Sequence, residues 1–469
     1  MRRHAPAAAI GLYAAGATLA PGAAATAALA APLVLVPTCW WILKGANHWI
    51  VAFLAAAILL PPLPLAYGNS GPHPALLLAA GGVAAGLVRL EEWRWKPDAL
   101  SRAMLMLLAI LAASVGSAAI YWGAEVAAGS LVRTGLFAIS VFVYLYLVHG
   151  PGRWAAMDYA AWTRGLLTAA MVSACFACVD FYYQLPAPAG YGAQFVWLNS
   201  GVFRRAQGLF YEASTLGNFC VCFLTLIGAV AMAGKRARIV GWWRLAMAGA
   251  MLAAAMVFSY SRASIVALGA ALVMMFYLRG GFRRQRRWIV VILLSLAVGG
   301  AAVYWLFPAF GANYLIRLSR SLEFFATDPN LILSGRLESW QRVIQLLADN
   351  PLYLLTGIGY KTLPYLELGG RPVVADNMYL SLLIETGVAG LAALIWLHVR
   401  ILQTAYRAAR HWNPMAQLFG MWMFCFWTGE MVQMLSGDLL TYWRVLPIYF
   451  WALACSKRLV ETEHERPAA

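Results

Sequence analysis

Apolar segments of about 20 residues follow one another along almost the whole chain, and this feature restricts the fold more than any other. A segment of this length and composition is what a helix needs to cross a lipid bilayer. Only 12% of the 469 residues are charged, which is about half the share found in soluble domains. Soluble, disordered, fibrous and disulfide-scaffold classes are therefore excluded, and the chain is predicted to be a membrane protein.

The segments predict an all-α fold, a polytopic transmembrane helix bundle of about 12–14 spans. We expect fourteen spans, at residues 7–20, 23–43, 48–66, 74–90, 101–122, 130–149, 162–183, 213–233, 242–258, 262–279, 287–307, 378–404, 415–434 and 440–456. The first is short and follows two arginines, so a cleaved signal peptide is an alternative. An uncleaved span is favoured because removing it would break the alternation of inner and outer segments.

The distribution of basic residues predicts the topology. With the N-terminus inside, 24 of the 35 Lys and Arg residues fall in inner segments, and six of the other 11 lie in residues 308–377. Inner loops of membrane proteins carry such an excess, so the net charge of +16 needs no nucleic-acid partner. Both termini are predicted to be cytoplasmic, with residues 308–377 on the outer face.

This topology divides the chain into four regions. They are N-terminal transmembrane helices (1–183), central transmembrane helices with a first outer loop (184–307), a large outer loop (308–377), and C-terminal transmembrane helices with a short cytoplasmic tail (378–469). A connection of about 70 residues is unusually long, which favours a functional role for the large outer loop.

The large outer loop contains a predicted amphipathic helix. Ser334 is a plausible N-cap, and apolar residues recur at helical spacing along one face: Leu337, Trp340, Ile344 and Leu347. Glu338 and Arg342 form an i,i+4 pair on the other face, and Asn350-Pro351 ends the helix. We expect such a helix to lie on the outer membrane surface or to cap the bundle.

Several arginines stand at outer ends of spans, where topology alone predicts few of them. They are Arg204, Arg205, Arg262, Arg336 and Arg444. A guanidinium group binds phosphate through two parallel hydrogen bonds and stays charged, which points to an anion site. Arg336 also begins the predicted helix, whose free N–H groups favour an anion. The alternative is that each arginine contacts lipid head groups or pairs with a nearby carboxylate.

Carboxylates near the same span ends offer a base. Glu212, Asp376 and Asp438 lie at or beside outer ends of spans, where each can also simply balance an arginine. Glu385 falls about two turns into a span, where a carboxylate is costly unless it has a partner. Nothing in the sequence resembles a His or Cys ligand set, so no metal site is predicted.

Five short motifs occur in a fixed order in the second half of the chain. They are Arg205-x-x-Gly208-Leu-Phe, Ser261-Arg262-Ala263, Ser334-Gly335-Arg336, Pro351…Gly357-x-Gly359, and Asp376-Asn377-x-Tyr379…Glu385-x-Gly387. In a polytopic protein with one long outer loop, this combination resembles the O-antigen ligase and polymerase superfamily of bacterial envelope enzymes. The resemblance covers roughly residues 195–450, and the first 180 residues match only as generic spans.

The resemblance implies a membrane glycosyltransferase that uses no cofactor and works at the periplasmic face of the bacterial inner membrane. Its substrate would be an oligosaccharide carried by undecaprenyl pyrophosphate. The family's pyrophosphate-binding arginines correspond to Arg205, Arg262 and Arg336, and the anion-site argument adds Arg204. We expect Asp376 or Glu212 as the catalytic base. Substrate contacts or structural support are expected from Tyr379, Asp438 and Arg444.

One departure from the family pattern separates its branches. Ligases that attach the polymer to lipid A core carry a histidine just before the span that begins near Met378, and this chain has Asp376 there. This favours an inverting, metal-independent polymerase of O-antigen or exopolysaccharide repeat units, with a chain-length regulator and a repeat-unit flippase as partners. A ligase is the first alternative. A transporter or flippase of lipid-linked glycans is the second, although no related halves with interrupted helices are found.

Overall fold

A computed structural model describes residues 47–63, 73–151, 158–185, 192–198, 201–210, 212–233, 239–283, 285–306, 335–368 and 371–464, together with isolated positions between 13 and 330. The predicted spans at 7–20 and 23–43, with the signal-peptide alternative, lie outside the described residues. The predicted N-cap Ser334 lies outside them as well.

The described part of the chain is an all-α helix bundle, as predicted. The long helices are α3 (His48–Leu59), α4 (Pro74–Val88), α5 (Ala99–Trp122), α6 (Ala124–His149), α7 (Tyr159–Tyr183), α8 (Ala213–Ala233), α9 (Trp242–Phe258), α10 (Arg262–Leu278), α11 (Arg286–Leu306), α16 (Met378–Ala409), α17 (Pro414–Gln433) and α18 (Leu446–His464). Most of them coincide with a predicted span to within a few residues at each end. Three predicted spans have bounds that are wrong by more: α3 ends at Leu59 rather than 66, α6 begins at Ala124 rather than 130, and α18 covers Leu446–His464 rather than 440–456. Five of the long helices, α5, α6, α7, α8 and α16, are long and apolar enough to cross a membrane. The chain is therefore a multi-pass membrane protein.

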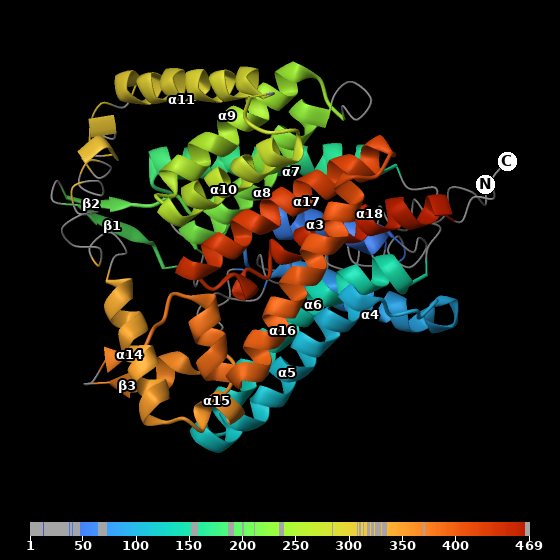
Figure 1. The fold of residues 1–469 in the computed structure, drawn as a ribbon, viewed down its shortest axis with the longest axis vertical. Coiled ribbons are helices and arrows are strands. Elements are labelled where there is room, and N and C mark those ends of the chain that lie inside the picture. Colours follow the sequence, from blue (N-terminus) through green and yellow to red (C-terminus); the bar gives the residue numbers. More distant parts are fainter. Residues whose placement is uncertain are drawn as a thin grey trace.

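The helices pack into one bundle around a shared apolar core. Helix α17 lies against α10 and α16, while α5 lies between α6 and α16 (Figure 1). Helix α18 packs on both α6 and α17, and α7 packs on α9. The core includes large aromatic side chains that are completely buried, such as Trp422, Trp427 and Trp451. Helix α11 runs along the edge of the molecule, apart from α5 and α16 (Figure 1).

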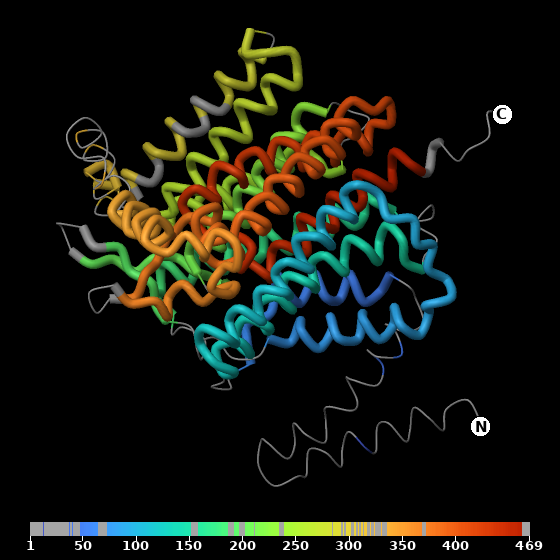
Figure 2. The backbone as a smooth tube through the Cα atoms, turned by 60° about the horizontal axis from the view of Figure 1, so that its bottom comes forward, coloured from blue at the N-terminus to red at the C-terminus, as the bar shows by residue number. Residues whose placement is uncertain are grey.

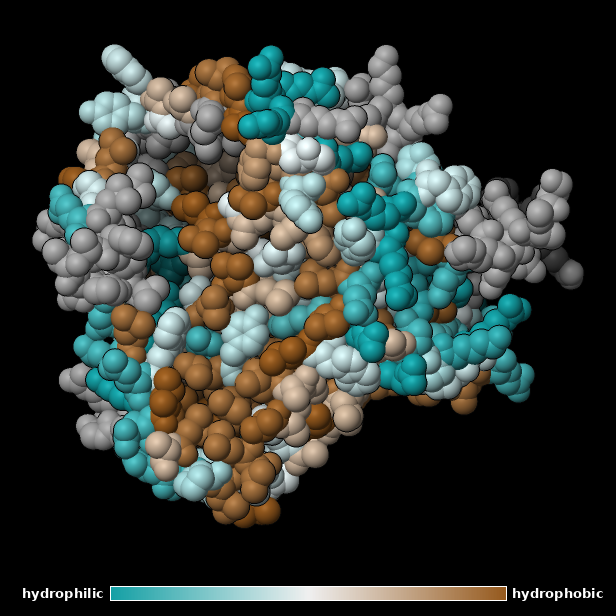
Figure 3. All heavy atoms as spheres, viewed as in Figure 1, coloured by the Kyte–Doolittle hydropathy of each residue, from teal (hydrophilic) through white to brown (hydrophobic). Residues whose placement is uncertain are grey.

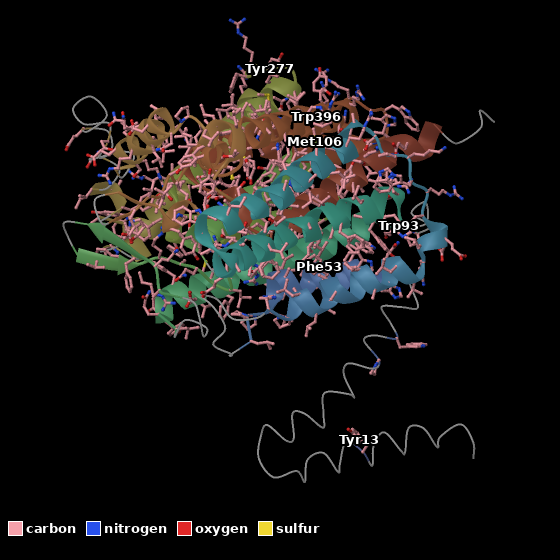
Figure 4. All side chains as sticks on the ribbon, turned by 90° about the horizontal axis from the view of Figure 1, so that it is seen from below. Tyr13, Phe53, Trp93, Met106, Tyr277 and Trp396 are labelled. Carbon is pink, nitrogen blue, oxygen red and sulfur yellow. The ribbon has the colours of Figure 1, made fainter. Side chains whose placement is uncertain are left out.

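Apolar side chains also cover much of the outside, as a lipid-facing surface requires. A broad hydrophobic area covers the lower centre of the face shown in Figure 3. On α5 and α16, exposed apolar residues include Met106, Ile120 and Ile395. Met106 and Trp396 lie close together in the view of Figure 4, whereas Trp93 lies toward one end of the bundle.

Two short antiparallel hairpins and several short helices lie outside the bundle helices. The hairpins are β1 (Phe195–Leu198) with β2 (Gly201–Arg204), and β3 (Glu367–Leu368) with β4 (Arg371–Pro372). The short helices are η1 (Leu90–Glu92), α15 (Tyr353–Thr356), η4 (Leu363–Tyr365), η5 (Met434–Ser436) and η6 (Leu439–Thr441). Hairpin β1–β2 lies at one end of the bundle and the end of α18 at the other (Figure 2). We call the first the loop end, where α8, α10, α16 and α18 begin, and the second the opposite end, where α5, α9 and α17 begin.

The predicted amphipathic helix is present as α14 (Arg336–Asp349), and it caps the loop end. Its end before Asn350-Pro351 is confirmed, and the predicted Glu338–Arg342 pair forms at 3.7 Å. The predicted apolar face is wrong in one respect. Ile344 is exposed, whereas the predicted Leu347 is buried together with Val343 and Leu346, and these three residues pack with residues of α16 and the turn at Ile358.

Helix α16 is broken two turns after it begins. Gly387 has φ 72°, which interrupts the helical hydrogen bonds and leaves preceding carbonyl groups without their usual donors. The turn at residues 357–361 enters at this break. The N–H groups of Ile358 and Gly359 donate to the carbonyls of Ile384 and Glu385, at 3.1 and 2.9 Å. The break in α16 therefore fixes residues 357–361 against the bundle.

Candidate functional site

Charged side chains from four separate connections meet at the loop end. Glu212 precedes α8, Arg336 begins α14, Asp376 precedes α16, and Asp438 lies between η5 and η6. Glu212 is close enough to Asp376, Arg205 and Lys361 for electrostatic interaction with all three. The folding of the bundle therefore brings together residues that are distant in the sequence.

Arg205 is held in this group by the backbone around it. Its N–H donates to the carbonyl of Gln194 at 2.8 Å, and its side-chain Nε donates to the carbonyl of Ser259 at 2.8 Å. In the described part of the chain, no hydrogen bond occupies the two terminal nitrogens of this guanidinium group. Burial lowers the pKa of Arg205, and the neighbouring Tyr442 and Glu212 oppose that shift. Arg205 is thus a fixed cation whose outer face can accept an anion.

Arg262 follows the turn between α9 and α10, and this turn is hydrogen-bonded to the segment that carries Arg205. It is the first residue of α10, and Ser261 caps the helix by accepting from the N–H of Ser264 at 3.4 Å. The carbonyls of Phe258 and Ser259 in the same turn accept hydrogen bonds from Ala206 and Arg205. Two hydrogen bonds therefore join the turn before Arg262 to the segment that carries Arg205.

Arg336 and Asp376 form a loose pair at the edge of the group. The Nε of Arg336 lies 3.5 Å from a carboxylate oxygen of Asp376, without hydrogen-bond geometry. Asp376 is 55% exposed, and its φ of 45° is rare for a residue other than glycine. The indole of Trp340 donates to the carbonyl of Ala375 at 2.9 Å, which ties α14 to the segment before α16.

Glu212 is the more enclosed of the two predicted catalytic carboxylates. It is half-buried, and the Ser214 hydroxyl donates to it at 2.9 Å. Burial raises the pKa of Glu212, and the negative charge of Asp376 adds to the rise, while Arg205 and Lys361 oppose it. A carboxylate with a raised pKa holds a proton more readily, which is the property that a general base requires.

Arg204 is placed differently from its neighbour Arg205. It forms a 3.2 Å ion pair with Asp180 of α7, and both side chains are largely buried. It also donates to the carbonyl of Leu185 at 2.5 Å. These contacts favour a role in joining hairpin β1–β2 to α7 rather than in the predicted anion site.

Arg444 and Tyr379 bond to the protein backbone. Arg444 is 4% exposed and donates to the carbonyls of three residues, namely Ala57, Leu60 and Leu209. Its guanidinium carbon also lies 4.9 Å from the centre of the Phe210 ring. The Tyr379 hydroxyl donates to the carbonyl of Met431 at 3.0 Å. Of the two roles predicted for these residues, the contacts favour structural support.

Two members of the group were not predicted from the sequence. Lys361 forms an ion pair with Asp438, and Tyr442 lies beside Glu212 and Arg205. Burial lowers the pKa of Lys361, while the carboxylates of Glu385 and Glu212 oppose this. One feature of the sequence could have pointed to Lys361. It follows two closely spaced glycines, and it is the only lysine in residues 308–377, where the other basic residues are arginines.

Glu385 has a structural partner at the break in α16. Its carboxylate faces the N–H groups of Lys361 and Leu363, the latter at 3.4 Å, and the side chain is 1% exposed. These contacts agree with the prediction that a carboxylate at this depth needs partners. Within the described residues, no group of three His, Cys, Asp or Glu side chains is arranged to hold a metal ion.

Comparison with known proteins finds one family match, in the second half of the chain. The family model described as O-antigen ligase matches residues 246–395, which extend from α9 to the first half of α16. These residues include Arg262, Arg336, Lys361 and Asp376. The resemblance to the O-antigen ligase and polymerase superfamily is thereby confirmed. No curated protein matches the chain.

Proposed function

We propose, from the O-antigen ligase domain at residues 246–395 and the charged group beside it, that the protein polymerises glycan repeat units. The units would be O-antigen or exopolysaccharide oligosaccharides carried by undecaprenyl pyrophosphate. Transfer would take place at the periplasmic face of the inner membrane, with both termini of the chain in the cytoplasm. The excess of basic residues at the opposite end of the bundle supports this orientation.

The observation that carries the proposal is the arrangement of Arg205 among charged neighbours. Arg205 interacts electrostatically with both Arg336 and Glu212, and of its guanidinium nitrogens only Nε is hydrogen-bonded within the described protein. A diphosphate leaving group gains negative charge as the sugar departs. Guanidinium groups fixed in advance stabilise that charge without reorganising at the moment of reaction.

The proposed reaction is a single displacement at the anomeric carbon. A hydroxyl oxygen of the acceptor sugar forms the new C–O bond while the bond from the anomeric carbon to the diphosphate oxygen breaks. The electron pair of that bond leaves with undecaprenyl pyrophosphate, and a carboxylate takes the hydroxyl proton. One displacement inverts the configuration at the anomeric carbon. The arginines supply the positive charge, so the proposed mechanism uses no metal.

Glu212 is our choice for the base. Its pKa is raised by burial, and a serine hydroxyl orients it, whereas Asp376 is exposed and sits beside Arg336. Asp376 is already paired with Arg336, and its exposed carboxylate is not enclosed with the other charged side chains as Glu212 is. In this proposal Asp376 instead positions Arg336 and keeps the pKa of Glu212 high.

An O-antigen ligase is the second candidate, and the description of the matching family favours it. The chain has Asp376 where the ligases it resembles carry a histidine, and we regard this as support for the polymerase. Both reactions have the same donor and leaving group. They differ in the acceptor, which is a second lipid-linked glycan for the polymerase and lipid A core for the ligase.

Purified protein in lipid nanodiscs tests the proposal with one donor and two acceptors. The donor is a synthetic undecaprenyl-pyrophosphate oligosaccharide, supplied alone or with lipid A core, with and without EDTA. We expect longer lipid-linked glycans from the donor alone, undiminished by EDTA. Transfer to lipid A core alone would establish the ligase, and loss of activity in EDTA that magnesium restores would overturn the metal-free mechanism. Movement of the donor across liposome membranes without any new bond would establish a transporter.

A further inference from the structure

The turn at residues 357–361 packs tightly at two glycines, where the Cβ atom of any other residue would collide with a neighbouring helix. Gly357 and Gly359 have φ values of 63° and 110°. A Cβ atom on Gly357 would lie 2.3 Å from the carbonyl oxygen of Glu385, and one on Gly359 would lie 2.5 Å from the Cβ of Ala118. The backbone of the turn is therefore wedged between α5 and α16. This packing also fixes the position of the Cα atom of Lys361, the last residue of the turn.

Lys361 extends its side chain from the turn to the connection between η5 and η6. Its own φ is 63°, in a region that residues with a Cβ rarely occupy. Its side chain is 8% exposed and forms an ion pair with Asp438, whose side chain is 23% exposed. The other carboxylate oxygen of Asp438, Oδ1, is buried without a hydrogen-bond partner in the described structure. The pair is thus incompletely bonded.

We propose that Lys361 is a further cation of the diphosphate site, which Asp438 balances while the site is empty and which binds a phosphate oxygen of the lipid-borne substrate. This inference rests on the function proposed above. An ammonium group has three donors, so Lys361 can keep its bond to Asp438 and still donate to phosphate. A compact point charge also complements the planar arginines, which bind phosphate in a fixed orientation.

The surroundings of Lys361 support this assignment. Lys361 interacts electrostatically with Glu212, which in turn interacts with Arg205, so the lysine belongs to the same charged group. A buried lysine needs a counter-charge when no ligand is present, and Asp438 supplies it. Strained backbone that the surrounding structure enforces is common at ligand sites.

The competing explanation is a structural clip, in which the pair only joins the outer loop to the connection before α18. The opposite end of the bundle provides a matched control for it. Lys457 of α18 is 9% exposed and lies 2.5 Å from Asp98, far from the charged group at the loop end. Replacing either lysine with methionine removes a buried, ion-paired ammonium group, but only Lys361→Met removes one from the proposed site.

The experiment measures affinity of the full-length protein in nanodiscs for farnesyl diphosphate and farnesyl monophosphate as probes. We expect Lys361→Met to weaken binding of the diphosphate by about 10- to 100-fold, since a charge-assisted hydrogen bond is lost. The monophosphate should be affected less because it makes fewer contacts. Lys457→Met should retain wild-type affinity in the folded fraction isolated by size exclusion, even if fewer molecules fold. Lys361→Arg should keep most of the affinity.

A charge swap separates the two explanations when folding is impaired. The double variant with Lys361→Asp and Asp438→Lys keeps an ion pair between the two positions, so a purely structural role is preserved. The positive charge, however, now lies at position 438 instead of on the turn. Weak diphosphate binding by this folded variant supports the inference, and wild-type binding by it, or by Lys361→Met, overturns it. If those variants bind normally while the wild type polymerises glycan, only this inference fails. A wild type that neither binds a prenyl diphosphate nor transfers glycan overturns the proposed function, and this inference with it.

Discussion

The two ends of the bundle each contain a buried lysine paired with an aspartate, but the pairs are constructed differently. At the opposite end, Lys457 lies within α18 and contacts both Asp98 and Glu461, at 2.5 and 3.3 Å. One oxygen of Asp98 binds the lysine, and the other accepts from the backbone and hydroxyl of Ser101. At the loop end, Lys361 lies on a wedged turn, and one oxygen of Asp438 has no hydrogen-bond partner in the described structure.

Two buried pairs with such different bonding show that the burial of an ion pair does not by itself indicate its role. Breaking a buried pair costs about 3–5 kcal/mol wherever it lies, because one charge is left without compensation. The pair at the opposite end is fully bonded, and it joins α5 to α18 as a clamp. The pair at the loop end keeps unused bonding capacity beside other charges, which is what a ligand site requires.

The prediction with the largest expected effect asks whether the catalytic residues lie only at the loop end. We expect Glu212→Gln to reduce glycan transfer by about 1,000-fold, because the amide cannot accept the acceptor's proton. The measurement is the initial rate of polymer formation by the nanodisc protein. Glu461→Gln at the opposite end, which also removes a carboxylate near a lysine, should leave the rate unchanged. Equal rates for the two variants would remove Glu212 from the mechanism and return Asp376 to consideration.

The next effect compares two arginines whose Nε atoms both donate to a backbone carbonyl. Arg205 bonds to Ser259 at 2.8 Å at the loop end, and Arg458 bonds to Leu147 at 3.1 Å at the opposite end. Arg205→Ala should lower the transfer rate by about 100-fold or more, since a charge that stabilises the leaving diphosphate is lost. Arg458→Ala should change the rate less than twofold. If both variants fall equally, Arg205 has only a structural function.

A third comparison uses two glycines with positive φ. Gly281→Ala at the opposite end meets no atom within 4 Å, so it should cost only the backbone penalty of about 1–2 kcal/mol. Gly359→Ala adds a collision with Ala118 and should cost about 2–4 kcal/mol in total. Thermal unfolding in detergent measures both variants. A cost for Gly359→Ala no larger than that for Gly281→Ala would show that the turn is not wedged.

The smallest effect is a shift in pH dependence. The base acts only when deprotonated, so a raised pKa of Glu212 makes activity fall on the acid side at a higher pH than an ordinary carboxyl would allow. Asp376 contributes to that raised pKa through its negative charge. Asp376→Asn should therefore move the acid limb of the transfer rate to lower pH, as measured from pH–rate profiles. A shift to higher pH, or none, would contradict the assignment of Glu212.

The helices of the bundle could be predicted from the sequence because the length and polarity of each apolar segment determine them. The bounds of α8, α9 and α10 follow the predicted segments almost residue for residue. Helix α14 was predicted with its final residues and its Glu338–Arg342 pair. Of its three buried residues only Leu347 was predicted, because Val343 and Leu346 are covered by the turn at Ile358 and by α16, and this packing depends on tertiary contacts.

The candidate site was predictable only in part, because its pairings also depend on tertiary contacts. Arginines and carboxylates at span ends could be recognised, and Arg205, Arg336, Glu212 and Asp376 do lie together. Their pairing could not be predicted, since Asp180 lies inside a predicted span and still meets Arg204. Lys361 was missed because its buried position results from the break in α16, which a continuous apolar segment does not reveal.

The break at Gly387 has a consequence for anyone who recombines such proteins. The carbonyls that it exposes accept hydrogen bonds from the turn at residues 357–361, so this turn and the first two turns of α16 depend on one another. A chimera that exchanges the loop alone would place the turn of one protein against the helix break of another. A chimera of two homologous proteins should therefore have its junction after residue 387, so that the loop and the first two turns of α16 come from the same protein.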